Sequence, residues 1–170
     1  FVFADVGTGS GAIAIALARS LPGAIVYALD RSGEALQVAA GNCARHQVAD
    51  RVVLRQGDLL APLGRPVDCI VANLPYVRSD ERGQLPPEIA CYEPWAAVDG
   101  GPDGLVYLRR LLAQAGRYLA TEGAIFLEIG AAQGSEAMAA AQCAFPKANV
   151  HLYRDYGGHD RVVAVQRGAK

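Results

Sequence analysis

Four consecutive residues in the middle of the chain, Asn73-Leu74-Pro75-Tyr76, have the groups with the clearest chemical use. A planar amide or amine nitrogen is a poor nucleophile because its lone pair is delocalised. A protein that modifies it must therefore orient its N–H bonds and stabilise the charge that develops on nitrogen. The Asn73 side-chain oxygen and the Leu74 carbonyl are two suitable acceptors, and Tyr76 can pack on the planar group. We assign these four residues as the candidate catalytic segment, with a simple asparagine–proline turn as the alternative.

A glycine-rich segment over residues 5–11 follows the apolar residues 1–4 and precedes a helical pattern. This order is typical of a strand, a turn and a helix N-terminus that together hold a nucleoside cofactor. Gly7 and Gly9 permit backbone angles and close approaches that a Cβ would block, and Gly11 lets the helix lie close to the strand and the ligand. A glycine-rich turn without a ligand is the alternative.

The spacing of these glycines indicates the type of cofactor. The dinucleotide pattern G-x-G-x-x-G needs its third glycine at position 12, which is Ala12, whereas the glycines here alternate at 7, 9 and 11. Asp5, at the end of the strand, repels a pyrophosphate but can hold a cation such as the ammonium of an amino acid. The pattern D-x-G-x-G-x-G therefore favours S-adenosylmethionine over NAD.

Two further acids follow later apolar runs. Asp30 can accept both hydrogen bonds of a ribose diol, or it can cap the helix that starts at residue 32 or 33. Asp58 can accept a hydrogen bond from an adenine amino group while Leu59 donates its backbone N–H; a plain turn aspartate is the alternative. The candidate cofactor-binding residues are thus Asp5, Gly7, Thr8, Gly9, Gly11, Asp30, Arg31, Asp58, Leu59 and Asn73.

The elements that position these residues follow from hydrophobic patterning. Runs of β-branched and aliphatic residues alternate with helical patterns, which is typical of βαβ units around a parallel sheet. The pattern predicts strands near residues 1–5, 25–29, 52–56, 67–72 and 123–129, and helices near 11–20, 32–46, 105–120 and 133–143, with Gly123 marking the stop of the third helix. Strands near 149–154 and 161–166 flank a glycine turn and are expected to pair as an antiparallel hairpin at the sheet edge.

The predicted fold is α/β and Rossmann-like, with a seven-stranded, mostly parallel sheet, one antiparallel edge strand and helices on both faces. The stretch 77–104 is predicted to be one long irregular loop, and a loop of that length in a compact domain is usually functional. Within it, Glu93 and Trp95 can line a substrate mouth or simply pack on the loop surface.

Composition bounds the class of protein. The 170 residues are 52% apolar and 19% charged, which suits one domain over residues 1–170 with a large buried core. A net charge of −1 disfavours nucleic acid as the main partner. The four cysteines lack metal-ligand spacing, so we expect no metal site and reduced thiols in the cytoplasm. No apolar run approaches a bilayer span and no basic leader precedes the first strand, so we expect a soluble, unexported monomer without a membrane partner.

The glycine segment, Asp30, the turn at residues 57–59 and the segment 73–76, in this order, resemble class I S-adenosylmethionine-dependent methyltransferases that modify planar nitrogens. The chain is more specifically similar to the release-factor glutamine methyltransferases at residues 92–105 (YEPWAAVDGGPDGL), 127–130 (LEIG) and 160–163 (DRVV). This resemblance covers nearly the whole chain. Its E-P-x-x-A-x-x-G-G-x-D-G-L pattern is not expected of DNA adenine methyltransferases.

The resemblance implies methyl transfer from S-adenosylmethionine to the side-chain amide nitrogen of the glutamine in the Gly-Gly-Gln motif of peptide-chain release factors. Asn73 and the Leu74 carbonyl would bind that glutamine. Leu74 stands where the family's Asn-Pro-Pro-Tyr has proline, which preserves the carbonyl but loses the fixed backbone angle. Trp95 stands where arginine commonly follows Glu-Pro, which removes a cation from the contact with the substrate protein.

The family also carries an N-terminal helical domain that helps to recognise the release factor. Because this chain begins inside its first predicted strand, it is interpreted as the catalytic domain alone. A DNA or RNA adenine methyltransferase and a non-catalytic cofactor-binding module are the alternatives.

Overall fold

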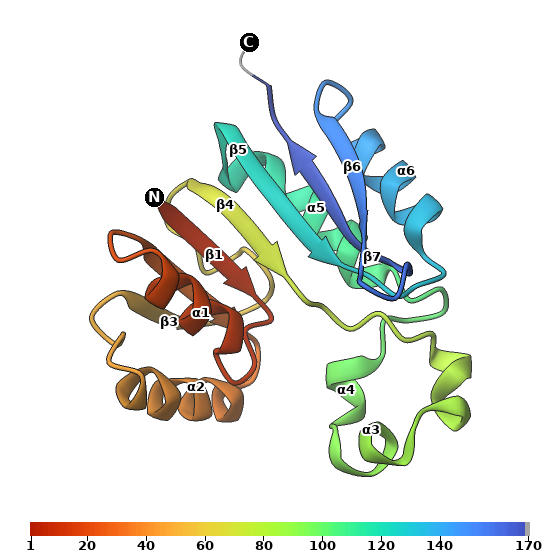
Figure 1. Ribbon diagram of the computed structural model, residues 1–170, viewed down its shortest axis with the longest axis horizontal. Coiled ribbons are helices and arrows are strands. Elements are labelled where there is room, and N and C mark those ends of the chain that lie inside the picture. The colour runs from red at the N-terminus through yellow and green to blue at the C-terminus, as the bar shows by residue number, and fades with distance from the viewer. Residues whose placement is uncertain (169–170) are drawn as a thin grey trace.

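A single sheet of seven strands organises the chain, with strand order β3-β2-β1-β4-β5-β7-β6. The computed structural model describes residues 1–168, and Figure 1 shows its elements. The strands are β1 (Val2–Val6), β2 (Ile25–Asp30), β3 (Val52–Gln56), β4 (Val67–Ala72), β5 (Leu119–Glu128), β6 (Asn149–Arg154) and β7 (Asp160–Gln166). The helices are α1 (Ala12–Ser20), α2 (Gly33–Arg45), the 3-10 helix η1 (Ser79–Gln84), α3 (Pro87–Tyr92), α4 (Trp95–Val98), α5 (Val106–Tyr118) and α6 (Gly134–Ala144).

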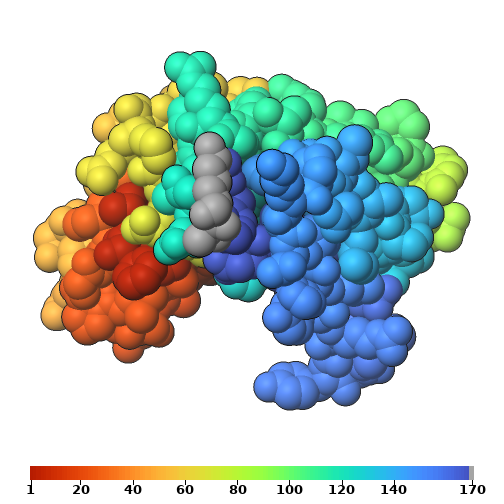
Figure 2. All heavy atoms as spheres, turned by 90° about the horizontal axis from the view of Figure 1, so that it is seen from above, coloured from red at the N-terminus to blue at the C-terminus, as the bar shows by residue number. Residues whose placement is uncertain are grey.

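The first five strands pair in parallel, as the alternation of strands and helices predicts. β7 pairs antiparallel with both β5 and β6, so the expected hairpin forms at the sheet edge. The reversed strand is β7, one place in from the edge, and β6 at the edge is antiparallel to it. The hairpin turn stands out from the surface as a blue projection in Figure 2. The predicted α/β fold with a mostly parallel seven-stranded sheet is confirmed.

Two apolar cores hold the layers together, one on each face of the sheet. Along β1, Ala4 and Val6 belong to the core shared with α5 and α6, whereas Phe3 belongs to the core shared with α1 and α2. This alternation is the period of a strand buried on both faces, and it confirms helices on both sides. No helix within residues 1–168 is long and apolar enough to cross a membrane.

Two predictions about the second half of the chain are wrong. Gly123 does not end the helix: α5 stops at Tyr118 because Leu119 already pairs with Val67 in the sheet. Gly123 lies inside β5 at an irregularity in register, where a Cβ would stand 2.9 Å from the Asp68 carbonyl oxygen. The stretch 77–104 is likewise not one irregular loop, because it contains η1, α3 and α4.

We call residues 77–104 the lobe, because in Figure 1 its helices lie apart from the sheet beyond the carboxyl end of β4. Its neck is made of backbone hydrogen bonds between its two ends. The Val77 amide donates to the Val98 carbonyl at 3.0 Å, and the Gly100 amide donates to the Val77 carbonyl at 2.7 Å. The lobe therefore leaves the domain and returns to it at one place.

Candidate functional site

A pocket of about 620 Å³ opens at the carboxyl ends of the parallel strands, where ligands of open α/β sheets bind. This volume is in the range of small-molecule and cofactor sites. The wall combines the glycine loop, the ends of β2, β3 and β4, and the lobe. Its residues are Val6, Gly7, Gly9, Ser10, Leu29, Asp30, Arg31, Ser32, Glu34, Ala35, Val38, Gly57, Asp58, Leu59, Asn73, Leu74, Pro75, Glu93, Pro94, Ala96, Ala97 and Tyr107.

The glycine loop adopts the backbone conformation that its sequence predicts. Gly7, Gly9 and Gly11 have φ angles of 73°, 55° and 84°, in the left-handed region that favours glycine. Gly9 faces open space, since a Cβ there would have no atom within 4 Å. Gly11 instead lies against α2, where a Cβ would stand 3.2 Å from that of Ala39. Gly7 and Gly9 thus form the pocket wall, and Gly11 makes room for helix packing.

Asp5 lies beneath the glycine loop and braces it. Its Oδ2 accepts hydrogen bonds from the Thr8 hydroxyl at 2.6 Å and the Ala14 amide at 3.0 Å. Burial raises the pKa of Asp5 to about 6, against the lowering effect of these hydrogen bonds. Its Oδ1 is buried without a hydrogen-bond partner among residues 1–168. A cation or a hydrogen-bond donor would satisfy this oxygen. Asp5 is only 1% exposed, however, and neither Asp5 nor its partner Thr8 is among the residues of the pocket wall.

Asp30 ties the end of β2 to the glycine loop. Its Oδ2 accepts a hydrogen bond from the Gly9 amide at 2.9 Å, and its Oδ1 accepts one from the Ser32 amide at 2.9 Å. Ser32 caps α2, because its side chain accepts from the Ala35 amide at 3.1 Å. Asp30 is therefore not the helix cap. Each of its oxygens has a second lone-pair direction, so the carboxylate can still accept from a diol in the pocket.

Asp58 also lines the pocket, but it has a protein partner. The Arg110 guanidinium on α5 donates to Asp58 Oδ2 at 2.7 Å, and both side chains are about half exposed. An adenine amino group would share the carboxylate with this cation. Leu59 is buried and has a φ of 48°, which is unusual for a residue with a side chain and typical of a constrained turn.

Arg31 connects the pocket to the lobe. It donates to the Ala96 carbonyl of α4 at 2.9 Å and to the Tyr107 hydroxyl of α5 at 3.1 Å. The guanidinium groups of Arg31 and Arg110 each lie 5.7 Å from the Tyr107 ring centroid, within the range of a cation–π interaction. Tyr107 and Ala96 are pocket residues that the sequence did not indicate. Both accept from Arg31, which is 76 positions from Tyr107 and 65 positions from Ala96 along the chain. No local sequence pattern could indicate contacts over these separations.

The candidate catalytic segment is divided between two sides. Asn73 is exposed and lines the pocket with Leu74 and Pro75, whereas Tyr76 lines a small adjacent cavity that also contacts Leu74 and Pro75. A Cβ on Gly7 would stand 3.1 Å from Leu74 Cδ2 and 3.5 Å from the Asn73 carbonyl oxygen. The structure therefore brings Asn73 to the glycine loop. It does not place Tyr76 on the wall of the larger pocket.

Two glycines bring the return of the lobe against this segment. A Cβ on Gly100 would stand 2.7 Å from the Pro75 carbonyl oxygen, and a Cβ on Gly104 would collide with the Tyr76 carbonyl oxygen. Gly104 also has a φ of 73°. Close backbone contact with residues 75–76 thus explains Gly100 and Gly104 of the segment D-G-G-P-D-G, whereas Gly101 has a φ of 90° and leaves room for the Val106 side chain.

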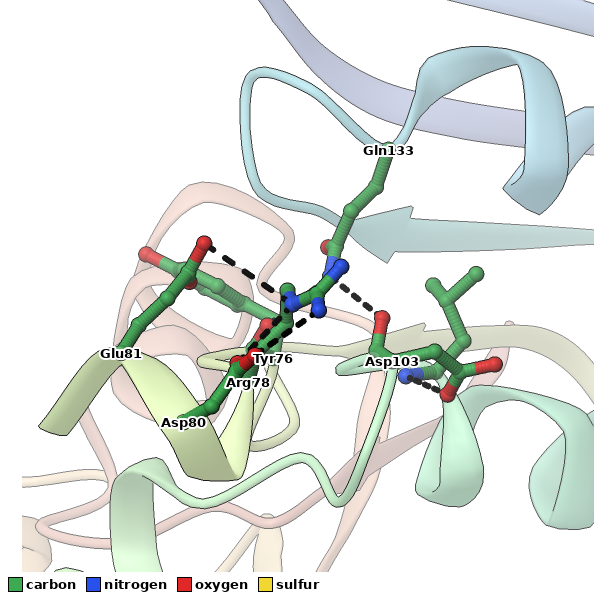
Figure 3. Close-up of polar contacts among 7 residues, drawn as sticks. Tyr76, Arg78, Asp80, Glu81, Asp103 and Gln133 are labelled. Carbon is green, nitrogen blue, oxygen red and sulfur yellow. Dashed lines mark hydrogen bonds and ion pairs between the residues drawn. The ribbon is translucent and has the colours of Figure 1, made fainter.

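Gln133, the residue that precedes α6, is a third residue that the sequence did not indicate. Its side-chain nitrogen donates to the Tyr76 carbonyl at 2.8 Å (Figure 3). Its side-chain oxygen accepts from the Gly130 amide at 2.8 Å. On the lobe side of Figure 3, Arg78 makes two hydrogen bonds of 3.0 Å to Asp80. Gln133 therefore links the end of β5 to the candidate catalytic segment.

The two lobe residues singled out from the sequence differ in position. Glu93 lines the pocket with its neighbour Pro94. Trp95 is not among the residues of the pocket wall, and the Arg82 guanidinium of η1 lies 4.9 Å from its ring centroid. This contact corresponds to packing within the lobe. Across residues 1–168, no three His, Cys, Asp or Glu side chains form a group that could hold a metal ion.

Comparison with known proteins places these features in a family. The chain is 42% identical over 165 residues to a release factor glutamine methyltransferase from Thermosynechococcus vestitus, covering 95% of this chain and 57% of that protein. It is 46% identical over 127 residues to a ribosomal protein uL3 glutamine methyltransferase from Bradyrhizobium diazoefficiens, covering 74% of this chain and 40% of that protein. The chain thus spans less than two thirds of the length of either relative.

A solved structure of a release factor-specific protein-(glutamine-N5) methyltransferase from Alicyclobacillus acidocaldarius is similar in fold. Its TM-score is 0.58 at 29% identity, covering 98% of this chain and 79% of that chain. These similarities agree with the class I methyltransferase fold expected from the motifs. The sequence model of the methyltransferase small domain family matches residues 2–88, which include the glycine loop, Asp30, Asp58 and the segment 73–76. The chain belongs to the methyltransferase small domain family.

Proposed function

We propose that this chain is the catalytic part of a protein-glutamine methyltransferase that acts on the Gly-Gly-Gln glutamine of peptide-chain release factors, with S-adenosylmethionine as methyl donor. The observation that carries the proposal is the contact between the glycine loop and residues 73–74. Asn73 and Leu74 both line a pocket suited to a nucleoside cofactor, and this supports the proposal that the Asn73 side-chain oxygen and the Leu74 carbonyl accept from a side-chain amide there. The relatives named as release factor methyltransferases support the choice of substrate.

Several residues would hold the cofactor. Gly7 and Gly9 give it room, Asp30 can accept from the ribose, and the unpartnered Asp5 oxygen can balance an ammonium. When bound, S-adenosylmethionine would supply an electrophilic methyl group, and breaking its sulfur–methyl bond would leave S-adenosylhomocysteine as the product.

The chain's own residues would act on the acceptor amide. Asn73 Oδ1 and the Leu74 carbonyl can accept its two N–H bonds and so direct the nitrogen lone pair toward the pocket. As the carbon–nitrogen bond forms, the nitrogen becomes acidic, and these acceptors stabilise the developing positive charge. The proton then passes to solvent, because Asn73 is exposed and no strong base is needed. The proposed reaction uses translation factors, so we place the chain in the cytoplasm, and we propose that it acts as a monomer.

Transfer of labelled methyl from S-adenosylmethionine to purified, unmethylated release factor tests the proposal. The matched control is a release factor whose Gly-Gly-Gln glutamine is replaced. Label on the intact factor alone supports the proposal, and label on duplex DNA would favour the adenine methyltransferase alternative. Ribosomal protein uL3 is the second protein to test, because one relative is named for methylating it. Label on uL3 alone would support methylation of a glutamine but would identify uL3, in place of a release factor, as the substrate.

A further inference from the structure

Gln133 lies where three segments of the chain meet. Its backbone begins α6, its side-chain oxygen accepts from Gly130 at the end of β5, and its side-chain nitrogen donates to Tyr76. A longer hydrogen bond of 3.4 Å from the same nitrogen reaches the Asp103 carbonyl, near the end of the lobe where the chain returns to the domain. One neutral side chain thus joins the sheet, the candidate catalytic segment and the return of the lobe.

The orientation of this side chain is fixed by its partners. The Gly130 amide can only donate a hydrogen bond, and the Tyr76 carbonyl can only accept one. The oxygen of the Gln133 amide must therefore face Gly130, and the nitrogen must face Tyr76. Both bonds are 2.8 Å long, so reversal of the amide would replace two good hydrogen bonds with two repulsive contacts.

Gly104 provides the space for this bond. A Cβ at position 104 would collide with both partners, the Gln133 side-chain nitrogen and the Tyr76 carbonyl oxygen. Gly130 shows a similar restriction, since a Cβ there would stand 3.0 Å from the Gln133 side-chain oxygen. Two glycines therefore leave Gln133 the room that its hydrogen bonds require.

The hydrogen bond from Gln133 to Tyr76 acts on residues 73–76, a segment that lacks the backbone rigidity of the motif Asn-Pro-Pro-Tyr. Leu74 has two free backbone dihedrals where a proline would fix φ, and Tyr76 is only two residues beyond it. A hydrogen bond to the Tyr76 carbonyl fixes the peptide plane that follows Tyr76, and this anchors the end of the segment that begins at Asn73. We propose that Gln133 is a positioning residue that fixes the Leu74 carbonyl and Asn73 for the acceptor amide. This inference rests on the proposed function, and it assigns Gln133 no contact with substrate.

The test compares Gln133→Glu with Gln142→Glu. The first keeps the size of the side chain and an acceptor for Gly130 but removes the donor to Tyr76. The second changes a glutamine on the same helix, whose nitrogen donates to the Pro146 carbonyl at 3.2 Å away from the pocket. With release factor as substrate, we expect kcat of Gln133→Glu to fall about 10- to 100-fold, as expected from a misplaced acceptor. The KM for S-adenosylmethionine and the Tm should remain close to those of Gln142→Glu.

Gly104→Ala disturbs the same bond from the opposite side without changing Gln133. It should lower kcat in the same way. The carbonyl carbon resonance of Tyr76 gives a readout independent of activity, and it should shift in Gln133→Glu and Gly104→Ala but not in Gln142→Glu. If the wild type does not methylate release factor, the proposed function is wrong. The Tyr76 resonance would still show whether Gln133 holds residues 73–76 in place.

Wild-type kcat in Gln133→Glu would overturn the inference, as would an unchanged Tyr76 resonance. A parallel loss of kcat, cofactor binding and Tm would also overturn it, because Gln133 would then support the fold in general. If Gln133→Glu does not fold, Gln133→Met is measured in the same way. Loss of folding in both variants would assign Gln133 to stability and end the proposal.

Discussion

Gly7 and Leu74 are packed so closely that a Cβ on the glycine would stand 3.1 Å from Leu74 Cδ2. Gly7 belongs to the glycine loop, and Leu74 belongs to the segment that we propose binds the acceptor amide. The two parts of the site are therefore in direct contact, and we expect a substitution in one part to alter the other.

Gly7→Ala should destabilise the chain by about 1–2 kcal/mol, because the left-handed backbone costs roughly 1 kcal/mol for a residue with a Cβ and the contact with Leu74 adds to it. Cofactor affinity should also fall. Urea denaturation and calorimetry with S-adenosylmethionine measure the two effects. Gly23→Ala is the control, since a Cβ there meets no atom within 4 Å. Equal behaviour of the two variants would contradict the packing argument.

Asn73→Ala should lower kcat about 100- to 1,000-fold, the usual cost of removing one preorganised polar group from a transition state. Cofactor affinity should change little, because the pocket keeps its other wall residues. Methyl transfer to release factor and calorimetry separate these effects. Asn149→Ala changes an exposed asparagine on β6 and should leave both unaltered. Full activity in Asn73→Ala would exclude the assigned role.

The pKa of Asp5 gives a pH dependence with a definite sign. Folding raises this pKa from 3.8 to about 6. At pH values between these two, the folded state therefore binds more protons than the unfolded state. Stability therefore falls as pH rises from about 4 to 6, by roughly 3 kcal/mol at most. Asp5→Asn removes this cost, so its stability relative to wild type should increase over the same pH window.

Urea denaturation at pH 4.5 and pH 7.5 measures this effect, with the exposed Asp50→Asn as control. A ligand cation near Asp5 favours the ionised carboxylate, so cofactor affinity of the wild type should rise through pH 6. In Asp5→Asn this rise should disappear. A constant difference between the stabilities of wild type and Asp5→Asn at both pH values would contradict the assigned titration.

Arg31→Ala should weaken cofactor binding about tenfold by releasing α4 from the pocket, since it removes two hydrogen bonds worth roughly 1 kcal/mol each in partly exposed sites. The change should appear mainly as faster dissociation, which stopped-flow fluorescence can follow. Arg117→Ala is the control, because Arg117 lies over the Tyr118 ring at the other end of α5. Unchanged dissociation in Arg31→Ala would mean that the lobe does not help to retain the ligand.

The sequence was sufficient to predict that seven strands exist, because short runs of β-branched and aliphatic residues recur along the chain, but it missed the start of β5 at Leu119. It was also sufficient for the glycine loop, since the unusual backbone angles predicted for Gly7 and Gly9 are present. Gly11 has a similar angle, and the helix that it lies against is α2. The short helices of the lobe could not be predicted, because α3 and α4 have only six and four residues and show no full helical period.

The missing parts of the site are long-range pairs between polar residues. Gln133 and Tyr76 are 57 positions apart, and Arg110 and Asp58 are 52 positions apart. Asp58 and Tyr76 were indicated by the sequence, but their partners Arg110, on α5, and Gln133, next to α6, are ordinary polar residues when taken alone, so only the fold shows the two pairs. Asp30 illustrates the converse case, since helix capping was open from the sequence until the structure placed Ser32 at the cap.

The neck of the lobe has an evolutionary consequence. Val77 and Asp99 are bridge partners, so the two ends of the intervening segment lie side by side on the domain. An insertion whose ends already meet can be shortened, lengthened or exchanged at small entropic cost to the rest of the chain. The sheet and the glycine loop can therefore remain constant in a lineage while different lobes are inserted between the same two points, each forming a different part of the pocket wall.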